Sequence, residues 1–276
     1  MLKADRPVKS QNTQCLYGAP ITLNYPGRGK GESVHPNSGD YRCICRSMVV
    51  AGSDGGVYFT NARGDILKYN NITEKIDICL SGGMRKDYFG SYDWTKPGSM
   101  SYNWRQVFWH PTYRGGCILG VHGNSGYMFM YRPSKTGRVN LVARLTSRPS
   151  QRSGTYDLFS YGYLGFTFVD NVVYYLTGAP IILPNGDRVK GKDTKKGEAK
   201  GLEYLHLITY NLETDHYHDH GAIFFEDGSF PTYVNSIAVL DNFVYAMGRR
   251  SSFDSDQGDS GERSDIFRVK FDISLV

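Results

Sequence analysis

The sequence predicts an all-β protein, specifically a β-propeller of about four to five four-stranded blades, and three observations support this prediction. The 276 residues include 21 Tyr, 14 Phe and 32 Gly, a composition suited to many short strands joined by turns. Apolar residues alternate or occur in short blocks, and no stretch keeps the 3.6-residue period of a helix over a dozen residues. One pattern of strands and turns also recurs four times, as propeller blades do.

The clearest copy of the pattern is SIAVLDNFVYAMGRR (236–250) followed by DIFRVKFD (265–272), in which Asp241-Asn242 stands where a hairpin turns. The other copies are SMVVAGSDGGVYFTN (47–61), HPTYRGGCILGVHG (110–123) and GFTFVDNVVYYLTG (165–178). Taking Val57, Ile118, Val173 and Val244 as equivalent, the intervals between copies are 61, 55 and 71 residues. Loops of different length account for the variation.

We therefore predict one β-propeller domain spanning residues 1–276. It is divided into a partial blade and lead-in at 14–46, blades at 47–80 and 105–145, a blade at 161–225 with an insertion at 179–201, and an incomplete blade at 231–276. Since a propeller removes its open edges by closing into a ring, either the strand near Thr22 completes the last blade or the chain belongs to a larger propeller of six to eight blades. The second is favoured. QCLYGAPITLNYPGRGKG (14–31), which is similar to LTGAPIILPNGDRVKG (176–191), would then be the end of a further blade.

Charge and hydropathy limit the expected partners and location. Lys plus Arg exceed Asp plus Glu by 32 to 27, which permits an acidic ligand and does not require nucleic acid. No apolar run is long enough to span a bilayer, so no membrane partner is expected. MLKADRPVKS is too polar for a secretory signal. The chain is therefore expected to be cytoplasmic, or secreted or periplasmic if its natural amino terminus lies upstream.

No cofactor is expected, although two polar runs leave a structural metal ion as an alternative. The five cysteines lack metal-ligand spacing. DHYHDHG (215–221) places three histidines on one face of a strand, yet an exposed polar edge explains the run equally well. DSDQGDSGE (254–262) has carboxylates spaced as in calcium loops but lacks the full pattern, which favours a plain loop.

Candidate site residues follow from aligning the four units at one mouth of the central channel, where propellers usually bind ligands. The alignment puts Arg46, Trp109-His110, Tyr163-Leu164 and Val234-Asn235 at the start of the innermost strands, and Asn61, His122, Thr177 and Gly248-Arg249 at the ends of the next strands. The predicted catalytic residues are His110, His122 and Tyr163. The predicted substrate-binding residues are Arg249, Arg250, Tyr161, Asn235, Trp109 and His35.

Imidazole, phenol and guanidinium groups around one cleft suit β-elimination of a uronic-acid polymer. Arg or imidazolium can neutralise the sugar carboxylate and so acidify the C5 proton. Tyr or His can remove that proton and protonate the leaving oxygen at C4. Structural roles remain open for each residue: a His before Pro111 can hold a turn, tyrosines can pack in a core, and the Arg pair can be a solvated loop start.

The HP and GVHGNSGY motifs, SYGYLGF, YYLTG and PTYVNSIAV resemble the propeller-type polysaccharide lyases, such as ulvan and rhamnose-glucuronate lyases, most specifically over residues 105–178. The resemblance implies a histidine pair, His110 and His122, a catalytic Tyr163 or Tyr161, and an Arg that neutralises the uronate. The family Arg would fall near residues 177–180, where this sequence has none, so Arg188 or Arg249 would replace it. We expect a lyase acting on acidic polysaccharide or oligosaccharide; the alternatives are a non-catalytic propeller that binds glycan or protein, and a truncated, inactive paralogue.

Overall fold

The described part of the chain is all-β, as the sequence predicts. The structure is a computed structural model that describes residues 49–61, 64–70, 72–86, 104, 106–122, 125–134, 137–152, 165–180, 203–251 and 264–276. Within these residues fifteen strands form four antiparallel sheets, the first three with four strands and the last with three. No helix in these ranges is both long enough and apolar enough to cross a membrane.

Each sheet is a meander in which strands that follow one another in the chain lie side by side. Sheet 1 contains β1 (Val50–Ala51), β2 (Val57–Thr60), β3 (Ile66–Asn70) and β4 (Lys75–Leu80). Sheet 2 contains β5 (Val107–His110), β6 (Cys117–His122), β7 (Tyr127–Tyr131) and β8 (Val139–Arg144). Sheet 3 contains β9 (Phe166–Val169), β10 (Val172–Pro180), β11 (Glu203–Asn211) and β12 (Tyr217–Ala222). Sheet 4 contains β13 (Phe230–Leu240), β14 (Phe243–Ser251) and β15 (Ser264–Lys270).

The turns between strands repeat from sheet to sheet. Asp170 and Asp241, each followed by Asn, have φ angles of 52° and 53° in the β9–β10 and β13–β14 hairpins. Such positive angles are tolerated by Asp and Asn and match the twist of a tight hairpin. The β3–β4 and β11–β12 turns are also alike, because the side-chain oxygens of Asn70 and Asn211 each accept two N–H groups from the turn that follows. Local sequence therefore fixes where these strands end.

The four positions that the sequence predicts to be equivalent all lie on the second strand of their sheet, which confirms the proposed repeat. We call Val57, Ile118, Val173 and Val244 the reference positions. In sheets 2, 3 and 4 the reference residue packs on the preceding sheet. In sheets 1, 2 and 3 the residue one place further along packs on the next sheet, as the alternation of a strand requires.

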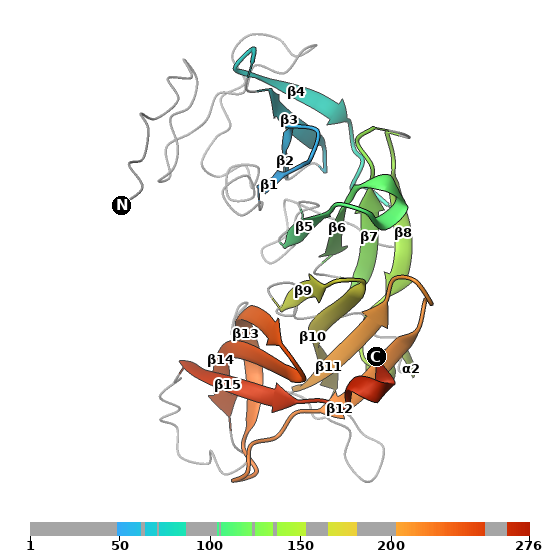
Figure 1. The fold of residues 1–276 in the computed structure, drawn as a ribbon. Helices are drawn as coiled ribbons and strands as arrows, with labels where there is room; N and C mark the ends of the chain where they lie inside the picture. Colours follow the sequence, from blue (N-terminus) through green and yellow to red (C-terminus); the bar gives the residue numbers. More distant parts are fainter. Residues whose placement is uncertain are drawn as a thin grey trace, which may run out of the picture.

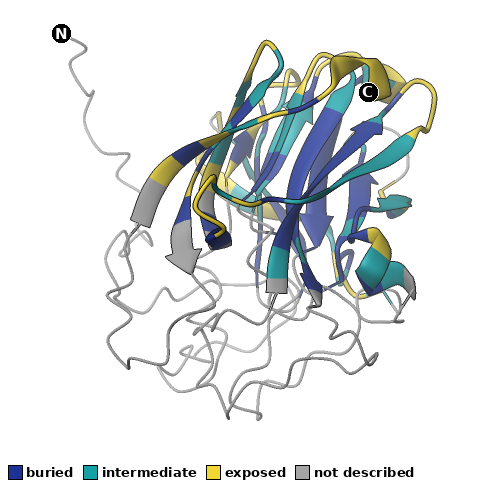
Figure 2. Ribbon diagram, turned by 90° about the horizontal axis from the view of Figure 1, so that it is seen from below, coloured by how far each residue is buried: buried dark blue, intermediate teal, exposed yellow. Residues whose placement is uncertain are grey.

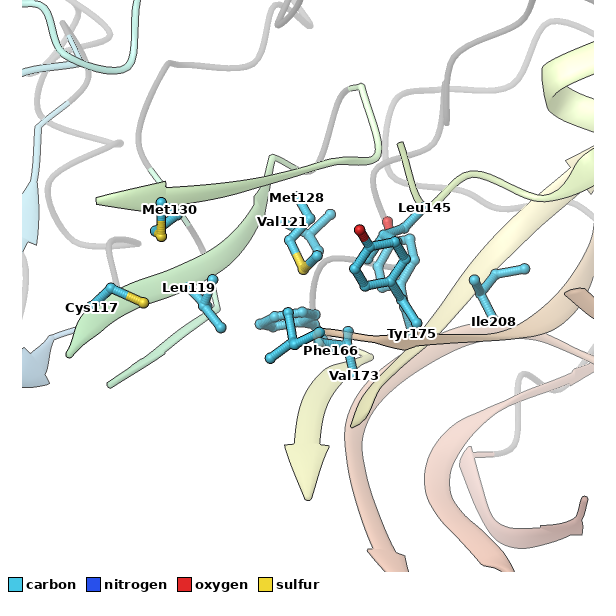
Figure 3. Close-up of a cluster of buried hydrophobic side chains, with 12 residues drawn as sticks. Cys117, Leu119, Val121, Met128, Met130, Leu145, Phe166, Val173, Tyr175 and Ile208 are labelled. Carbon is cyan, nitrogen blue, oxygen red and sulfur yellow. The ribbon is translucent and has the colours of Figure 1, made fainter. Parts of the chain in front are cut away.

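Three buried apolar clusters join consecutive sheets. Sheets 1 and 2 share a cluster around Trp104, whose ring stacks on Phe129 at 6.2 Å. Sheets 2 and 3 share the cluster drawn in Figure 3, in which Leu119, Val121 and Met128 meet Phe166 and Tyr175. Sheets 3 and 4 share a third cluster. Burial of these large side chains between sheets, at about 25 cal/mol per Å² of apolar surface, is the main favourable term of the fold.

The four sheets follow one another along an open arc (Figure 1). The turns that join the first strand of each sheet to the second, and the β3–β4, β7–β8 and β11–β12 turns, lie at one end of the sheets. We call this the short-turn end. The connections β2–β3, β6–β7, β10–β11 and β14–β15, and those between sheets, leave from the other end, which we call the loop end. Figure 2 shows buried residues along the middle of the strands and exposed residues in the turns of the short-turn end.

Short helices complete the described elements. A 3-10 turn, η2 (Tyr113–Gly115), connects β5 to β6 at the short-turn end, and Arg114 within it has a φ of 52°. A short helix, α2 (Arg148–Arg152), follows β8 at the loop end. A last 3-10 turn, η4 (Ile273–Leu275), follows β15 and is capped by the Asp272 carboxylate, which accepts the Ser274 N–H.

Candidate functional site

The predicted histidine pair does not converge, because His110 and His122 lie at opposite ends of sheet 2. In the β5–β6 register His110 pairs with Cys117, the first residue of β6, whereas His122 is its last residue. Five residues of extended strand separate their Cα levels by about 16 Å. The expectation that both imidazoles line one mouth is therefore wrong. Trp109 and His110 end the innermost strand β5 rather than begin it, since β5 spans Val107–His110.

His110 has a structural role at the short-turn end. Its Nδ1 accepts the backbone N–H of Tyr113 at 3.0 Å, so Nε2 carries the proton and donates it to the carbonyl oxygen of Asp170, also at 3.0 Å. The ring stacks on Phe168 with centroids 4.7 Å apart, and the residue is 3% exposed. Both ring nitrogens are engaged and the ring joins sheet 2 to sheet 3, so this imidazole is unsuited to proton transfer with a substrate.

Trp109 likewise packs between sheets at the short-turn end. A Cβ added at Gly52 would lie 3.0 Å from the indole, and one added at Gly116, whose φ is 91°, would lie 3.1 Å from it. The indole is therefore enclosed by two backbone segments that only glycine allows to come so close. A substrate-binding role for Trp109 at the predicted mouth is wrong for the same reason as for His110: the side chain belongs to the other end.

His122 does lie at the loop end, where β6 meets the turn to β7. It is 2% exposed, and its Nδ1 lies 3.1 Å from the Ser125 hydroxyl oxygen. Burial lowers the pKa of His122 to about 3, because an imidazolium would lose its hydration there. The side chain is therefore neutral at physiological pH and can take part in hydrogen bonds, but it does not provide the positive charge that would neutralise a carboxylate.

The structure describes the other predicted site residues only in part. Arg249 and Arg250 lie on β14 opposite Tyr233 and Pro231, so their backbone is at the loop end. Asn235 lies in β13 where the register shifts between Val234 and Ser236. The side chains of these three residues, and the whole of Tyr161, Tyr163, His35, Arg46 and Arg188, lie outside the described residues. His122 and the end of β14 therefore both lie at the loop end of their sheets, whereas Trp109 and His110 lie at the short-turn end.

Sequence analysis missed a buried polar cluster at the loop end between sheets 2 and 3. The junction cluster comprises Ser147, Ser150, Thr177, His206 and Asp219. His206 Nδ1 lies 2.8 Å from Asp219 Oδ1, with the two side chains 9% and 4% exposed. The hydroxyl groups of Ser147 and Ser150 donate to the carbonyl oxygen of Gly178 at 3.0 and 3.2 Å.

Asp219 is the centre of the junction cluster. Besides His206, its carboxylate accepts the N–H of Arg148 at 2.7 Å and that of Gly221 at 2.9 Å. Burial alone would raise the pKa of Asp219, but these hydrogen bonds outweigh burial and lower the pKa below its ordinary value. The ionised carboxylate therefore holds the start of α2 against sheet 3, and with it the chain that leads from sheet 2 to sheet 3.

The histidine run on β12 does not form a metal centre together with Asp219. Strand alternation turns Asp219 away from His218 and His220, whose rings lie 4.5 Å apart on the opposite face. His216 is further away, with its ring 6.3 Å from that of His218. Within the described ranges, no three His, Cys, Asp or Glu side chains are arranged to hold a metal ion. The DSDQGDSGE run lies outside the described residues.

The resemblance to polysaccharide lyases has no support from comparison with known proteins: no protein-family model and no curated protein matches this chain.

Proposed function

We propose that the chain forms part of a β-propeller that acts on an acidic carbohydrate at its loop end, as a lyase that cleaves uronic-acid-containing polysaccharide by β-elimination. The propeller is supported by four meander sheets that are joined at three interfaces by residues in equivalent positions. It is also supported by their succession along an arc (Figure 1). A ring of such sheets would remove the open faces at the two ends of the arc.

A site at the loop end is supported by one observation: buried polar residues recur at or near the loop end of the second strand in sheets 1, 2 and 3. Asn61, His122 and Thr177 are 3%, 2% and 0% exposed, and they occupy corresponding places just after or at the end of β2, β6 and within β10. Strand interiors in the same sheets are apolar. Buried polar groups are costly unless they are held by hydrogen bonds, and their repetition at one end favours a binding surface there.

The proposed chemistry assigns roles to one of the two arginines, to Tyr163 and to His122. Arg249 or Arg250 binds the uronate carboxylate, which makes the C5 proton more acidic. Tyr163, three residues before β9 in the sequence, removes that proton. The C4–O bond then breaks as the C4=C5 double bond forms, and the phenol returns the proton to the leaving oxygen. His122, neutral because of its lowered pKa, contributes a hydrogen bond and no charge.

The test is to incubate the full chain with a panel of uronate polymers that includes rhamnose-glucuronate linkages, and to measure the ultraviolet absorbance of unsaturated ends. Tyr163→Phe should reduce product formation about 100-fold or more, the usual size of a proton-transfer contribution. His110→Gln, at the other end of sheet 2, is the control and should leave the rate unchanged below its melting temperature. If the unmodified chain yields no unsaturated ends from any polymer, the lyase is rejected.

A second candidate is a propeller that binds acidic glycan at the loop end without cleaving it. The position of His110 favours this candidate, since only one of the two predicted imidazoles is at the loop end. The low pKa of His122, about 3, also makes that group a weak base. Calorimetric binding of a rhamnose-glucuronate oligomer without the release of unsaturated ends would support binding alone, and absence of binding would reject both candidates.

A further inference from the structure

Sheet 1 has an apolar face that points away from sheet 2. The register aligns its residues in two rows across three strands: Val57, Tyr69 and Ile76 form one row, and Phe59, Leu67 and Ile78 form the other. We call these six residues the sheet 1 outer face. Leu67 is 1% exposed and the other five are half-buried. Within the described part of the chain, none of the three buried clusters includes any of the six.

Equivalent residues in the other sheets indicate that such a face packs on a neighbouring sheet. In sheets 2, 3 and 4 the reference residue packs on the preceding sheet: Ile118, Val173 and Val244 are 0%, 1% and 0% exposed. The corresponding residues of sheet 1 are Val57 and, two places further on, Phe59. These two residues therefore occupy positions that elsewhere in the chain receive a neighbouring sheet.

The chain before sheet 1 has the length and the sequence of another repeat. Residues 16–23, LYGAPITL, are identical at six of eight positions to residues 176–183, LTGAPIIL, which include the end of β10. Sheet 1 spans 31 residues from Val50 to Leu80, and 48 residues precede Val49. Each of the three clusters joins sheets that are consecutive in the chain, so a unit before sheet 1 is expected on sheet 1.

We propose that residues 1–48 form a further sheet unit that docks on the sheet 1 outer face, with residues 16–23 as its counterpart of β10. The contact is apolar and continues the interface that already repeats three times along the arc. It is independent of the carbohydrate chemistry proposed above.

Sheet 4 offers the competing docking surface. Leu240, Met247 and Ile266 are 63%, 38% and 80% exposed on the side of sheet 4 that faces away from sheet 3. Ring closure by residues 1–48 on this side would complete the last sheet, the first of the two arrangements that the sequence allows. The chain enters sheet 1 directly at residue 49, however, whereas sheet 4 is its most distant sheet in the sequence. This continuity favours sheet 1.

Hydrogen–deuterium exchange of the full chain distinguishes the two surfaces. In the unmodified protein the amides of residues 16–23 should exchange at least about 100-fold more slowly than in an unstructured peptide, as expected of a packed strand. Ile78→Lys places a charge on the sheet 1 outer face and should accelerate their exchange about 10-fold or more. Ile266→Lys is the matched control on sheet 4 and should leave exchange at 16–23 within about twofold.

Exchange in β6 and β10 reports whether each variant is folded, and Ile76→Asn replaces Ile78→Lys if the lysine unfolds sheet 1. The proposal is overturned if residues 16–23 exchange like an unstructured peptide in the unmodified protein. It is also overturned if Ile266→Lys, and not the sheet 1 variant, releases them, which would place them on sheet 4. Conversion of a dimer to a monomer by Ile78→Lys, with exchange at 16–23 unchanged, would instead show that a second copy covers the face.

Discussion

Burial of His122 should make the fold sensitive to mild acid. In the unfolded chain the imidazole titrates near 6.5, while burial lowers the pKa of the folded residue to about 3. Below pH 6.5 the unfolded chain therefore binds a proton that the folded chain does not. Because the folded pKa is the lower one, the contribution of His122 to stability is complete above pH 6.5 and is lost progressively as the pH falls toward 3.

The size of the effect follows from proton linkage. Each pH unit within this window changes the free energy of unfolding by about 1.4 kcal/mol, so a shift from pH 7.5 to pH 5 should remove about 2 kcal/mol. A loss of that size is a large fraction of the 5–15 kcal/mol typical of domains. His122→Asn keeps an amide near Ser125 and removes the titrating group. We expect that variant to be less stable at pH 7.5 and to have a flatter pH profile.

The assay is urea denaturation of the full chain at several pH values between 5 and 7.5, comparing the slope of stability against pH. Gly120→Val, which should destabilise the fold by overpacking without removing a titrating group, serves as the control and should keep the slope of the unmodified protein. Parallel profiles for the unmodified protein and His122→Asn would refute the reasoning, because they would mean that His122 is not desolvated in the folded state.

Three further predictions concern the junctions between sheets. Asp219→Asn should lower the free energy of unfolding by about 2–4 kcal/mol at pH 7, since it weakens three hydrogen bonds to a carboxylate that is 4% exposed. In the unmodified protein this contribution should be lost only as the pH falls below about 4, because the folded pKa of Asp219 is lowered. A loss of less than about 0.5 kcal/mol in the variant would contradict this role. His110→Gln should cost about 1–3 kcal/mol by losing the Phe168 stack and a hydrogen bond, and unchanged denaturation midpoints would argue against its role between sheets. Gly120→Val should lower the free energy of unfolding by about 1–3 kcal/mol through overpacking, since an added Cβ would lie 2.5 Å from Val107 and 2.7 Å from Phe129. An unchanged melting temperature in thermal unfolding would contradict this prediction.

Repetition made the sheets predictable from sequence. The Asp241-Asn242 turn and the four reference positions are found where the pattern places them, because hairpin turns and strand alternation depend on neighbouring residues. The sequence analysis placed Trp109 and His110 at the wrong end of β5, because no local turn signal marks the end of this strand. VFWH ends at His110 and the 3-10 turn at 113–115 follows, but HPTYRGGC lacks the Asp-Asn signal of the other hairpins, so the sequence does not mark the strand end.

The junction cluster could not be predicted from sequence. His206 and Asp219 come from adjacent strands, and the register between those strands shifts at His206/Ile208. A one-residue shift changes which side chains share a face, and no local pattern announces it. Asp219 also bonds to Arg148, which is 71 residues away in the chain. The sequence pattern of residues 215–221 points to the histidines, whereas the contact that joins α2 to sheet 3 is made by Asp219, which lies between two of them.

The proposal that the loop end is the functional end is tested most directly by isothermal titration calorimetry with a rhamnose-glucuronate oligomer. His122→Ala and Arg249→Ala at the loop end should each raise Kd about 10-fold or more, as expected for loss of hydrogen-bonded contacts in a binding site. His110→Gln and Trp109→Phe at the short-turn end should leave Kd within about twofold. Weakened binding in the short-turn variants, with unchanged binding in the loop-end variants, would contradict the account.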